Sequence, residues 1–473
     1  MFSRRGTLAV VCLATAMLML DIAVVNTALP KIASSLDAGI SGLQWVVDAY
    51  TVALAAVVLT SGSIADRFGR RRLFVIGLVV FTGASLWCGA AGNIAMLDAA
   101  RAVQGLGAAI LFATSLALLA DAFPDWKERS KALAIYGATI GASFAVGPAV
   151  GGAMTSYLGW RWVFYVNVPV GIATIAATYR WVRESRDPNA RRVDWPGQTA
   201  LVAGLFLLVL GLLRGNQVGW GSAQIVAELG GAVLLLAGFL AIETRVKEPM
   251  LPLGLFRNKE FAGAQIAVFS ISASFFAIFL YTTLYLQQIL DLSPIQAGLV
   301  YLPATMLIFV VSGMSASLLE KVSAGALIAF GLAFVTIGLA LGLLATATSS
   351  WWLLKPSLLV GGLGTGLYNP AGAAVALGSV PQEQSGLAAG VNDTFRQAGI
   401  AVGVALFGAL IPGAAAFGQG SAESFVSGLH TALIVGAVLA AIGAVASAYL
   451  IPVRRAGAKV EQLPVGVELA EAA

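Results

Sequence analysis

Runs of about twenty apolar residues, separated by short breaks, follow one another from Thr7 to Leu450. A helix needs about 20 mainly apolar residues to cross the hydrocarbon core of a bilayer. The sequence therefore predicts an all-α integral membrane protein with fourteen transmembrane helices. The expected spans are 7–29, 44–64, 73–92, 95–119, 131–157, 162–182, 197–214, 223–243, 261–288, 295–318, 324–346, 352–378, 386–411 and 426–450.

The composition excludes most other classes of protein. Of 473 residues, 59% are hydrophobic and 11% are charged, whereas a soluble domain carries about 25% charged residues. Cys12 and Cys88 lie inside apolar runs, which argues against a disulfide framework or a thiolate metal site. The single histidine, His430, stands apart from any cluster with catalytic spacing. We therefore expect no enzyme activity, no metal and no cofactor, and no soluble signalling domain is visible that would suit a sensor.

The N-terminus has a feature of signal peptides, because Arg4 and Arg5 precede an apolar stretch. That stretch continues to Leu29 without a convincing small-residue cleavage site, so a retained first helix is the better interpretation.

Basic residues alternate between the loops. With the spans given above, 22 of the 28 Lys and Arg residues fall at the N-terminus, in every second loop and in the C-terminal tail. Cytoplasmic loops carry this excess in membrane proteins. We therefore expect a multi-pass protein of the cell membrane with both termini in the cytoplasm. The net charge of +5 follows from this topology and does not indicate nucleic-acid binding.

Two charged, proline-containing segments, 183–195 and 245–260, divide the chain as cytoplasmic linkers. Six expected spans precede the first, two lie between them, and six follow the second. The predicted fold therefore has two pseudo-symmetric six-helix bundles in a 6+2+6 plan. The predicted parts are an N-terminal bundle (1–182), the linkers with two extra helices (183–258), a C-terminal bundle (259–451) and a cytoplasmic tail (452–473).

The two predicted bundles also share a short motif. Gly105-Leu106-Gly107 is followed by Pro124 nineteen residues after Gly105, and Gly362-Leu363-Gly364 is followed by Pro381 at the same spacing. Transporters are commonly built from internal repeats.

Asp21 is an acid in the middle of an expected span, where ionisable side chains are costly and mark functional paths. Arg101 lies at nearly the same depth in the fourth span, so the two side chains are expected to pair. Burial favours a neutral carboxyl group and a neighbouring guanidinium favours the carboxylate, which suits a proton carrier. The alternative is a static ion pair that only fixes helix packing.

Four other polar residues are candidates for a substrate cavity. Asp48 and Tyr50 lie near the outer end of the second span, and Asp48 is close enough to the interface to be simply hydrated. Asp393 and Arg396 lie at helical spacing in the thirteenth span, where they either face a cavity or pair with each other.

Between the second and third spans the chain reads GSIADRFGRRR from Gly62 to Arg72. As topology alone, this acid–base cluster stops a helix. Asp66 and Arg70 could also form a network that breaks and re-forms as the two halves of a transporter move.

The fifth span carries several glycines and one proline, which allow close helix packing and a bend. They are Gly137, Gly141, Gly147-Pro148 and Gly151-Gly152. Ordinary close packing and control of leakage between the halves are both compatible with this pattern.

Taken together, these motifs resemble the fourteen-helix drug:proton antiporter group of the major facilitator superfamily over nearly the whole chain. The matching segments are Leu20-Asp21 through Asn26 to Pro30, Gly62 to Arg72 with Asp66, Arg67, Gly69 and Arg70, Arg101-x-x-Gln104-Gly105-x-Gly107, Gly147-Pro148-x-x-Gly151-Gly152, Gly159-Trp160-Arg161-Trp162 with Asn167-Val168-Pro169, and Asp194-Trp195-x-Gly197. The resemblance implies that Arg101 takes part in proton coupling, and it adds Asn26 and Gln104 to the cavity candidates. The counterpart of the Gly62–Arg72 motif, around Leu318 to Lys321, is degenerate, so a symmetric cytoplasmic latch is not expected.

The resemblance implies a monomeric antiporter, driven by the proton gradient without a cofactor, that exports bulky amphipathic compounds such as drugs or antibiotics by alternating access. Its partners are expected to be a small amphipathic substrate, protons and the lipid bilayer. The alternative is a dedicated exporter of one endogenous metabolite, lipid or siderophore.

Overall fold

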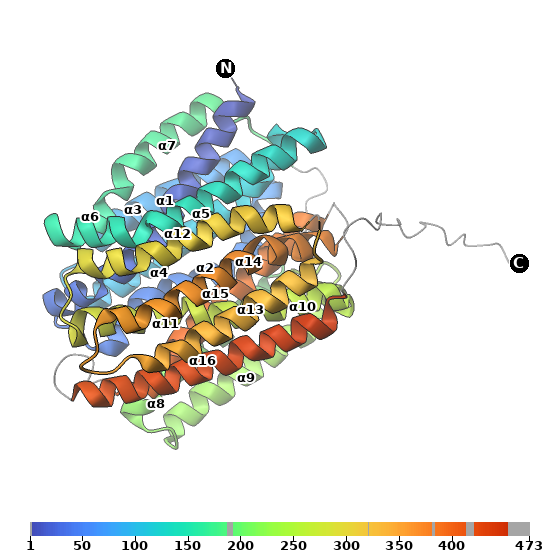
Figure 1. Cartoon of the computed structure of the whole chain (residues 1–473). Coiled ribbons are helices and arrows are strands. Elements are labelled where there is room, and N and C mark those ends of the chain that lie inside the picture. The colour runs from blue at the N-terminus through green and yellow to red at the C-terminus, as the bar shows by residue number, and fades with distance from the viewer. Residues whose placement is uncertain (1, 187–192, 320, 381–383, 413–420, 453–473) are drawn as a thin grey trace, which may run out of the picture.

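The computed structural model describes residues 2–186, 193–319, 321–380, 384–412 and 421–452, so the expected tail lies outside it except for its first residue. Every regular element in these ranges is a helix. Figure 1 numbers the helices as α1 (Arg4–Leu36), α2 (Ile40–Phe68), α3 (Arg70–Gly89), α4 (Ile94–Ala122), α5 (Trp126–Tyr157), α6 (Trp162–Tyr165), α7 (Asn167–Trp181), α8 (Trp195–Val218), α9 (Ala223–Glu243), α10 (Lys259–Ile271), α11 (Ile278–Leu284), α12 (Pro294–Leu318), α13 (Ala324–Leu341), α14 (Lys355–Gly378), α15 (Ser385–Leu410) and α16 (Ala422–Leu450). Short π or 3₁₀ segments are η1 (Leu253–Arg257), η2 (Ser272–Phe276), η3 (Tyr285–Ile289), η4 (Gly342–Leu344) and η5 (Trp351–Leu354).

Twelve helical segments in the described part of the chain are long and apolar enough to cross a membrane, in agreement with the expected class. The expected spans 352–378 and 386–411 correspond to α14 and α15, which are helices of 24 and 26 residues outside this set of twelve. Both pack inside the bundle: α14 lies against α12 and α13, and α15 lies against α2.

The long helices run side by side as one bundle (Figure 1). One end of this bundle holds the N-terminus and the loop at 69, and we call it the basic face. Hydrogen bonds connect helix ends there: Ser3 N–H donates to the carbonyl of Trp181 at 3.2 Å, and Arg70 N–H donates to that of Ser185 at 2.9 Å. Helices α8 and α9 lie at one edge of the bundle, where α8 packs against both α2 and α15 and α9 packs against α8.

The repeated Gly-Leu-Gly motif packs in the same way in both places. A Cβ atom on Gly105 of α4 would lie 3.0 Å from Tyr50 Cα in α2, and one on Gly107 would lie 2.7 Å from the Phe81 nitrogen in α3. In α14, a Cβ on Gly362 would lie 3.0 Å from the Ala304 carbonyl oxygen in α12, and one on Gly364 would lie 2.8 Å from the Val335 nitrogen in α13. Each motif thus lets one helix approach two neighbouring backbones, which only glycine permits.

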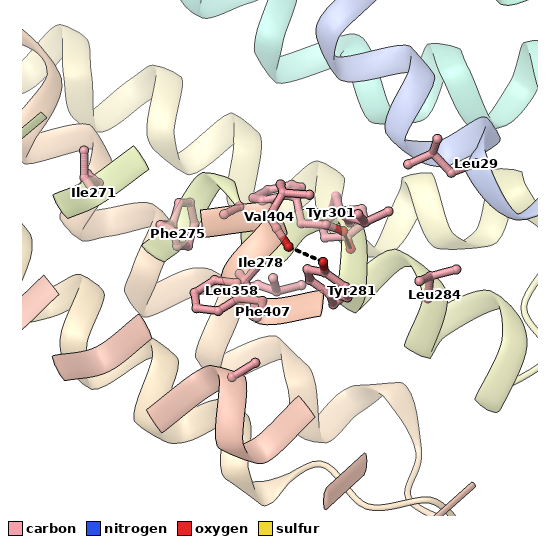
Figure 2. Close-up of a cluster of buried hydrophobic side chains, with 14 of the residues drawn as sticks. Leu29, Ile271, Phe275, Ile278, Tyr281, Leu284, Tyr301, Leu358, Val404 and Phe407 are labelled. Atoms are coloured by element: carbon pink, nitrogen blue, oxygen red, sulfur yellow. Dashed lines mark hydrogen bonds between the residues drawn. The ribbon is translucent and has the colours of Figure 1, made fainter. Parts of the chain in front are cut away.

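Two expected spans are interrupted. The segment 162–182 divides into α6 and α7 at Val166, and the segment 261–288 runs as α10, η2, α11 and η3, with two π-helical stretches. Figure 2 shows the apolar cluster around the second interruption, where the Tyr281 hydroxyl donates to the carbonyl of Val404 in α15. π-Helical stretches often occur at functional sites. The first of these two stretches, η2, faces the centre of the bundle.

Candidate functional site: a buried ion pair beside a central cavity

Asp21 in α1 and Arg101 in α4 form an ion pair in the interior of the protein. Arg101 Nη1 lies 2.6 Å from Asp21 Oδ2. The two residues are only 1% and 2% exposed. The structure therefore brings together the two side chains that their depth in the sequence suggested would meet.

Neutral side chains surround this pair. Gln104 Nε2 and Asn167 Nδ2 each donate to Asp21 Oδ1 at 2.9 Å, while Gln104 Oε1 accepts from Arg101 Nη1 at 2.7 Å. Ser85 in α3 accepts a further bond from Gln104 at 2.9 Å. The Asp21 carboxylate of α1 therefore accepts from three donors, which α4 and α7 supply. Ser85 adds α3 to the same network, so one carboxylate connects four helices. We call these five residues the Asp21 network.

Arg101 also has two partners in α2. Its Nε donates to the Val46 carbonyl at 2.9 Å, and its guanidinium carbon lies 4.3 Å from the centre of the Tyr50 ring. A cation over an aromatic face is attracted by the ring quadrupole. The guanidinium is therefore held by three kinds of partner, and a change in the charge of Asp21 alters only one of them.

A small cavity of about 50 Å³ lies beside Arg101, between α1, α2, α4 and α5 on one side and η2, α11 and α15 on the other. Among the candidate residues, Asn26, Tyr50, Arg101 and Pro148 line it, whereas Gln104 belongs to the buried network. Most of the remaining lining is apolar and includes Phe144, Phe276, Phe279 and Leu280. Pockets for drug-sized ligands measure about 300–1,000 Å³, so the cavity in this conformation is closed to such a ligand.

Asp48 is placed away from this cavity, at the contact between α2 and the second half. It is 0% exposed, and neither of its carboxylate oxygens has a hydrogen-bond partner in the described structure. One turn earlier, Gln44 donates to the Tyr281 hydroxyl at 2.7 Å and so joins α2 to α11.

Asp393 and Arg396 are also outside the cavity lining. Their nearest charged atoms are 3.8 Å apart, and their side chains are 25% and 39% exposed. One face of α15 carries Arg396, Ile400 and Val404 at intervals of four residues. Ile400 and Val404 line the cavity. The two charges therefore lie on the approach to the cavity from the basic face.

The Gly62–Arg72 motif forms a turn at the basic face. Arg70 Nη2 lies 2.8 Å from Asp66 Oδ1. Gly69 has a φ of 117°, a backbone conformation that residues other than glycine rarely adopt. Glu184, in the segment after α7, accepts from the backbone N–H groups of Arg71 and Arg72 at 3.0 and 3.2 Å. The carboxylate of Glu184 thus binds the N-terminal end of α3, where the helix dipole favours a negative charge. Gly62 has open space where a Cβ would be, and the guanidinium of Arg67 lies 5.8 Å from the Phe68 ring centre.

We expect Asp66→Asn and Arg70→Ala to slow the conformational cycle and to leave ligand binding intact. The Asp66–Arg70 pair is partly exposed and distant from the cavity, so its loss weakens the turn and touches no lining residue. Transport rate and equilibrium binding of a fluorescent substrate, measured on the same purified protein, test this. Loss of affinity with an unchanged rate of conformational exchange would show that the motif acts on the binding site.

The glycines of α5 bring this helix into contact with both α1 and α12. A Cβ on Gly151 would lie 2.7 Å from Val24 Cα of α1, and one on Gly152 would lie 2.8 Å from Ile295 Cα of α12. Gly147 packs in the same way against Ala23. The helix that carries Pro148 therefore holds a backbone from each half at contact distance.

Gly152→Ala is therefore expected to force α5 and α12 apart and to destabilise the closed arrangement by about 1–3 kcal/mol, which is typical of overpacking. Gly137→Ala on the same helix is the matched control, because a Cβ there meets no atom within 4 Å. Transport and thermal stability of both variants provide the measurement. If both variants behaved alike, the close contact between α5 and α12 would have no role in the mechanism.

Several residues of the site were not identified as such from the sequence. Ser85 and Glu184 lie in segments with no motif, and Gln44 and Tyr281 meet across 237 positions. Asn167 was recognised only as part of a motif. A polar residue inside an apolar run was the one available signal, and it applied to Ser85 in the expected span 73–92.

A bundle of long apolar helices around a cavity, with a buried ion pair beside it, is typical of a membrane transporter. The chain belongs to the Major Facilitator Superfamily, which it matches over residues 11–404. It is 36% identical over 398 residues to the multidrug resistance protein Stp of Mycobacterium tuberculosis strain CDC 1551, covering 84% of this chain and 73% of that protein. It is 37% identical over 413 residues to the puromycin resistance protein pur8 of Streptomyces alboniger, covering 86% and 82%. The human organic anion transporter MFSD10 (TETRAN) has the same fold, with a TM-score of 0.58 at 14% identity, covering 93% of this chain and all of that one.

Proposed function

We propose that this protein is a proton-driven efflux antiporter that exports bulky amphipathic compounds by alternating access. The observation that carries the proposal is the position of Arg101, which binds the Asp21 carboxylate at 2.6 Å and also lines the central cavity. A proton on Asp21 removes the negative charge that attracts Arg101 and leaves the guanidinium with neutral partners only, which lowers the cost of turning it toward the cavity. Proton binding and substrate binding therefore compete through one side chain.

The conformation supports an alternating-access cycle. Gln287 Nε2 donates to the Thr27 carbonyl at 2.9 Å, and Ile295 N–H donates to the Ser156 hydroxyl at 3.1 Å. These bonds, like that between Gln44 and Tyr281, join the two halves near the face opposite the basic face. The pathway is thus closed on that side, while the partly exposed Arg396 faces the basic side.

We further propose that α14 and α15 cross the membrane with the twelve apolar spans, giving fourteen crossings in a monomer with both termini in the cytoplasm. The basic face is then cytoplasmic, and α8 and α9 form the pair between the two six-helix bundles. Cysteine labelling of the 245–252 segment and of position 220 tests this topology. A reagent confined to the outside should modify position 220 alone, and modification of 245–252 would overturn the orientation.

The alternative is a dedicated exporter of one compound, and pur8 favours it because its name refers to a single antibiotic. The Asp21 network serves either function. Transport across a panel of cationic, neutral and anionic compounds separates the two possibilities.

The test uses everted membrane vesicles with an imposed pH gradient. Uptake of several amphipathic compounds should depend on the gradient and disappear when an ionophore collapses it. Uptake that persists without a gradient would exclude proton coupling, and uptake of one compound alone would favour the dedicated exporter.

A further inference from the structure

Two buried carboxyl groups meet at the basic-face end of α8 and α9, far from the Asp21 network. Asp194 is the N-cap of α8 and is 5% exposed; Glu243 ends α9 and is 3% exposed. Each uses one oxygen to accept a backbone N–H: Asp194 Oδ1 from Gly197 at 3.0 Å, and Glu243 Oε2 from Leu251 at 3.0 Å.

The other oxygen of each group has no donor. Asp194 Oδ2 and Glu243 Oε1 are both buried without a hydrogen-bond partner when the groups are treated as carboxylates. They lie on the same side of Gly197, where an added Cβ would contact Asp194 Oδ2 and would lie 2.9 Å from Glu243 Oε1. Glycine at this position therefore lets the two oxygens approach each other.

No cation compensates this pair among the described residues. The groups that face Glu243 are the Asp194 carboxyl from α8 and the Leu251 N–H from the segment after α9. Arg245 and Lys247 of that segment form no ion pair with either carboxyl. On the α2 side, Thr60 and the Ala56 carbonyl hydrogen-bond to Gln198 of α8. Two adjacent buried carboxylates without a cation repel each other strongly, and a single shared proton relieves this repulsion.

We propose that Asp194 and Glu243 form a second proton-binding site, in which one carboxyl group carries the proton and donates it to the facing oxygen of the other. The proton comes from the water at the basic face, which the proposed function places in the cytoplasm. The pair then carries one negative charge, with every oxygen either donating or accepting. Only the assignment of the basic face to the cytoplasm rests on the proposed function. The shared proton between Asp194 and Glu243 does not require transport.

The site lies where three parts of the protein meet. Gln198, one residue after Gly197, donates to the Ala56 carbonyl at 2.8 Å and accepts from Thr60 Oγ1, both in α2. Leu251, whose N–H binds Glu243, is followed along the chain by η1 and α10. Loss of the shared proton at alkaline pH creates a second charge, which separates the start of α8 from the end of α9. The proton thus controls how firmly the α8–α9 pair is attached between the two halves.

The test uses purified full-length protein and the variants Glu243→Gln and Asp194→Asn. An amide keeps the shape and donates one hydrogen bond to the remaining carboxylate, so the pair stays connected without a shared proton. Glu228→Gln is the matched control, because Glu228 is the other buried acid of α9 and is ion-paired with Arg214 at 3.0 Å. Infrared difference spectra between mildly acidic and alkaline buffer report protonated carboxyl groups directly.

Wild type and Glu228→Gln are expected to show the loss of the same protonated-carboxyl bands as the pH rises. Each pair variant should lack one of them, equivalent to one carboxyl per chain. Because the folded protein keeps a proton that the unfolded chain has already released by about pH 5, its stability falls as the pH rises toward the pKa of the folded pair. The Tm of wild type should therefore decrease with pH more steeply than that of Glu243→Gln.

Identical carboxyl bands and parallel Tm curves for wild type and Glu243→Gln would overturn the second proton site. Neither measurement depends on a transported substrate, so this result would leave the proposed efflux function untouched. Conversely, failure of gradient-driven export with intact bands in the pair would reject the transport proposal and keep the proton site.

Discussion

Replacement of Asp21 by Asn is expected to reduce gradient-driven export to the level of vesicles that lack the protein. Asn has the size of Asp but cannot take up or release a proton, so the step that couples the gradient to Arg101 disappears. The fold should remain, because Arg101 keeps the Val46 carbonyl, the Gln104 amide oxygen and the Tyr50 ring as partners. Vesicle transport with an imposed pH gradient measures the first effect, and size-exclusion profiles measure the second.

Asp48→Asn is the companion variant, since Asp48 is the other fully buried acid of the first half. If Asp21→Asn retained gradient-dependent export and Asp48→Asn lost it, the coupling role would move to Asp48. A loss in both would indicate two carboxyl groups in the proton path.

The parts of this site that the sequence predicted follow from depth, from periodicity or, for Asn26 and Gln104, from the family resemblance. Asp21 and Arg101 could be matched because helices rise by a constant 1.5 Å per residue, so distance from a common membrane face translates into position. The Gly105 and Gly362 motifs could be matched because each half needs the same close helix contacts. All fourteen expected spans were visible in the sequence as apolar runs, which burial in lipid demands, and twelve of them correspond to the helical segments that are long and apolar enough to cross a membrane.

Other features have no local signature. The Glu184 carboxylate binds the start of α3 across more than one hundred positions, and Gln44 meets Tyr281 in the other half. Helices α14 and α15 were predicted as spans from the sequence but fall outside the set of twelve apolar segments, because α14 is rich in glycine and α15 carries Asp393 and Arg396. Such residues can lie in a membrane helix only where neighbouring helices cover them, and coverage depends on the tertiary fold.

Replacement of Arg101 by Ala is expected to be harsher than Asp21→Asn. The substitution leaves the Asp21 carboxylate buried without its cation and removes the donors to the Val46 carbonyl and to Gln104 Oε1. Breaking a buried ion pair by removing one partner costs about 3–5 kcal/mol. Expression and thermal stability should fall, and the protein that remains should hold Asp21 protonated, so that any residual transport no longer depends on pH. Arg101→Lys is the informative control, because it keeps the charge but cannot reach these acceptors with one planar fork.

The double variant Asp21→Asn with Arg101→Ala separates a coupling pair from a static one. If the pair only fixes helix packing, the neutral double variant removes the uncompensated charge and should recover both stability and export. If Asp21 carries the proton, stability should recover while gradient-driven export stays absent, since no titratable group remains in the network. Thermal unfolding and vesicle transport, measured on the wild type, both single variants and the double variant, complete this cycle. Recovery of export would assign the pair to packing and leave Asp48 or Asp393 as the proton carrier.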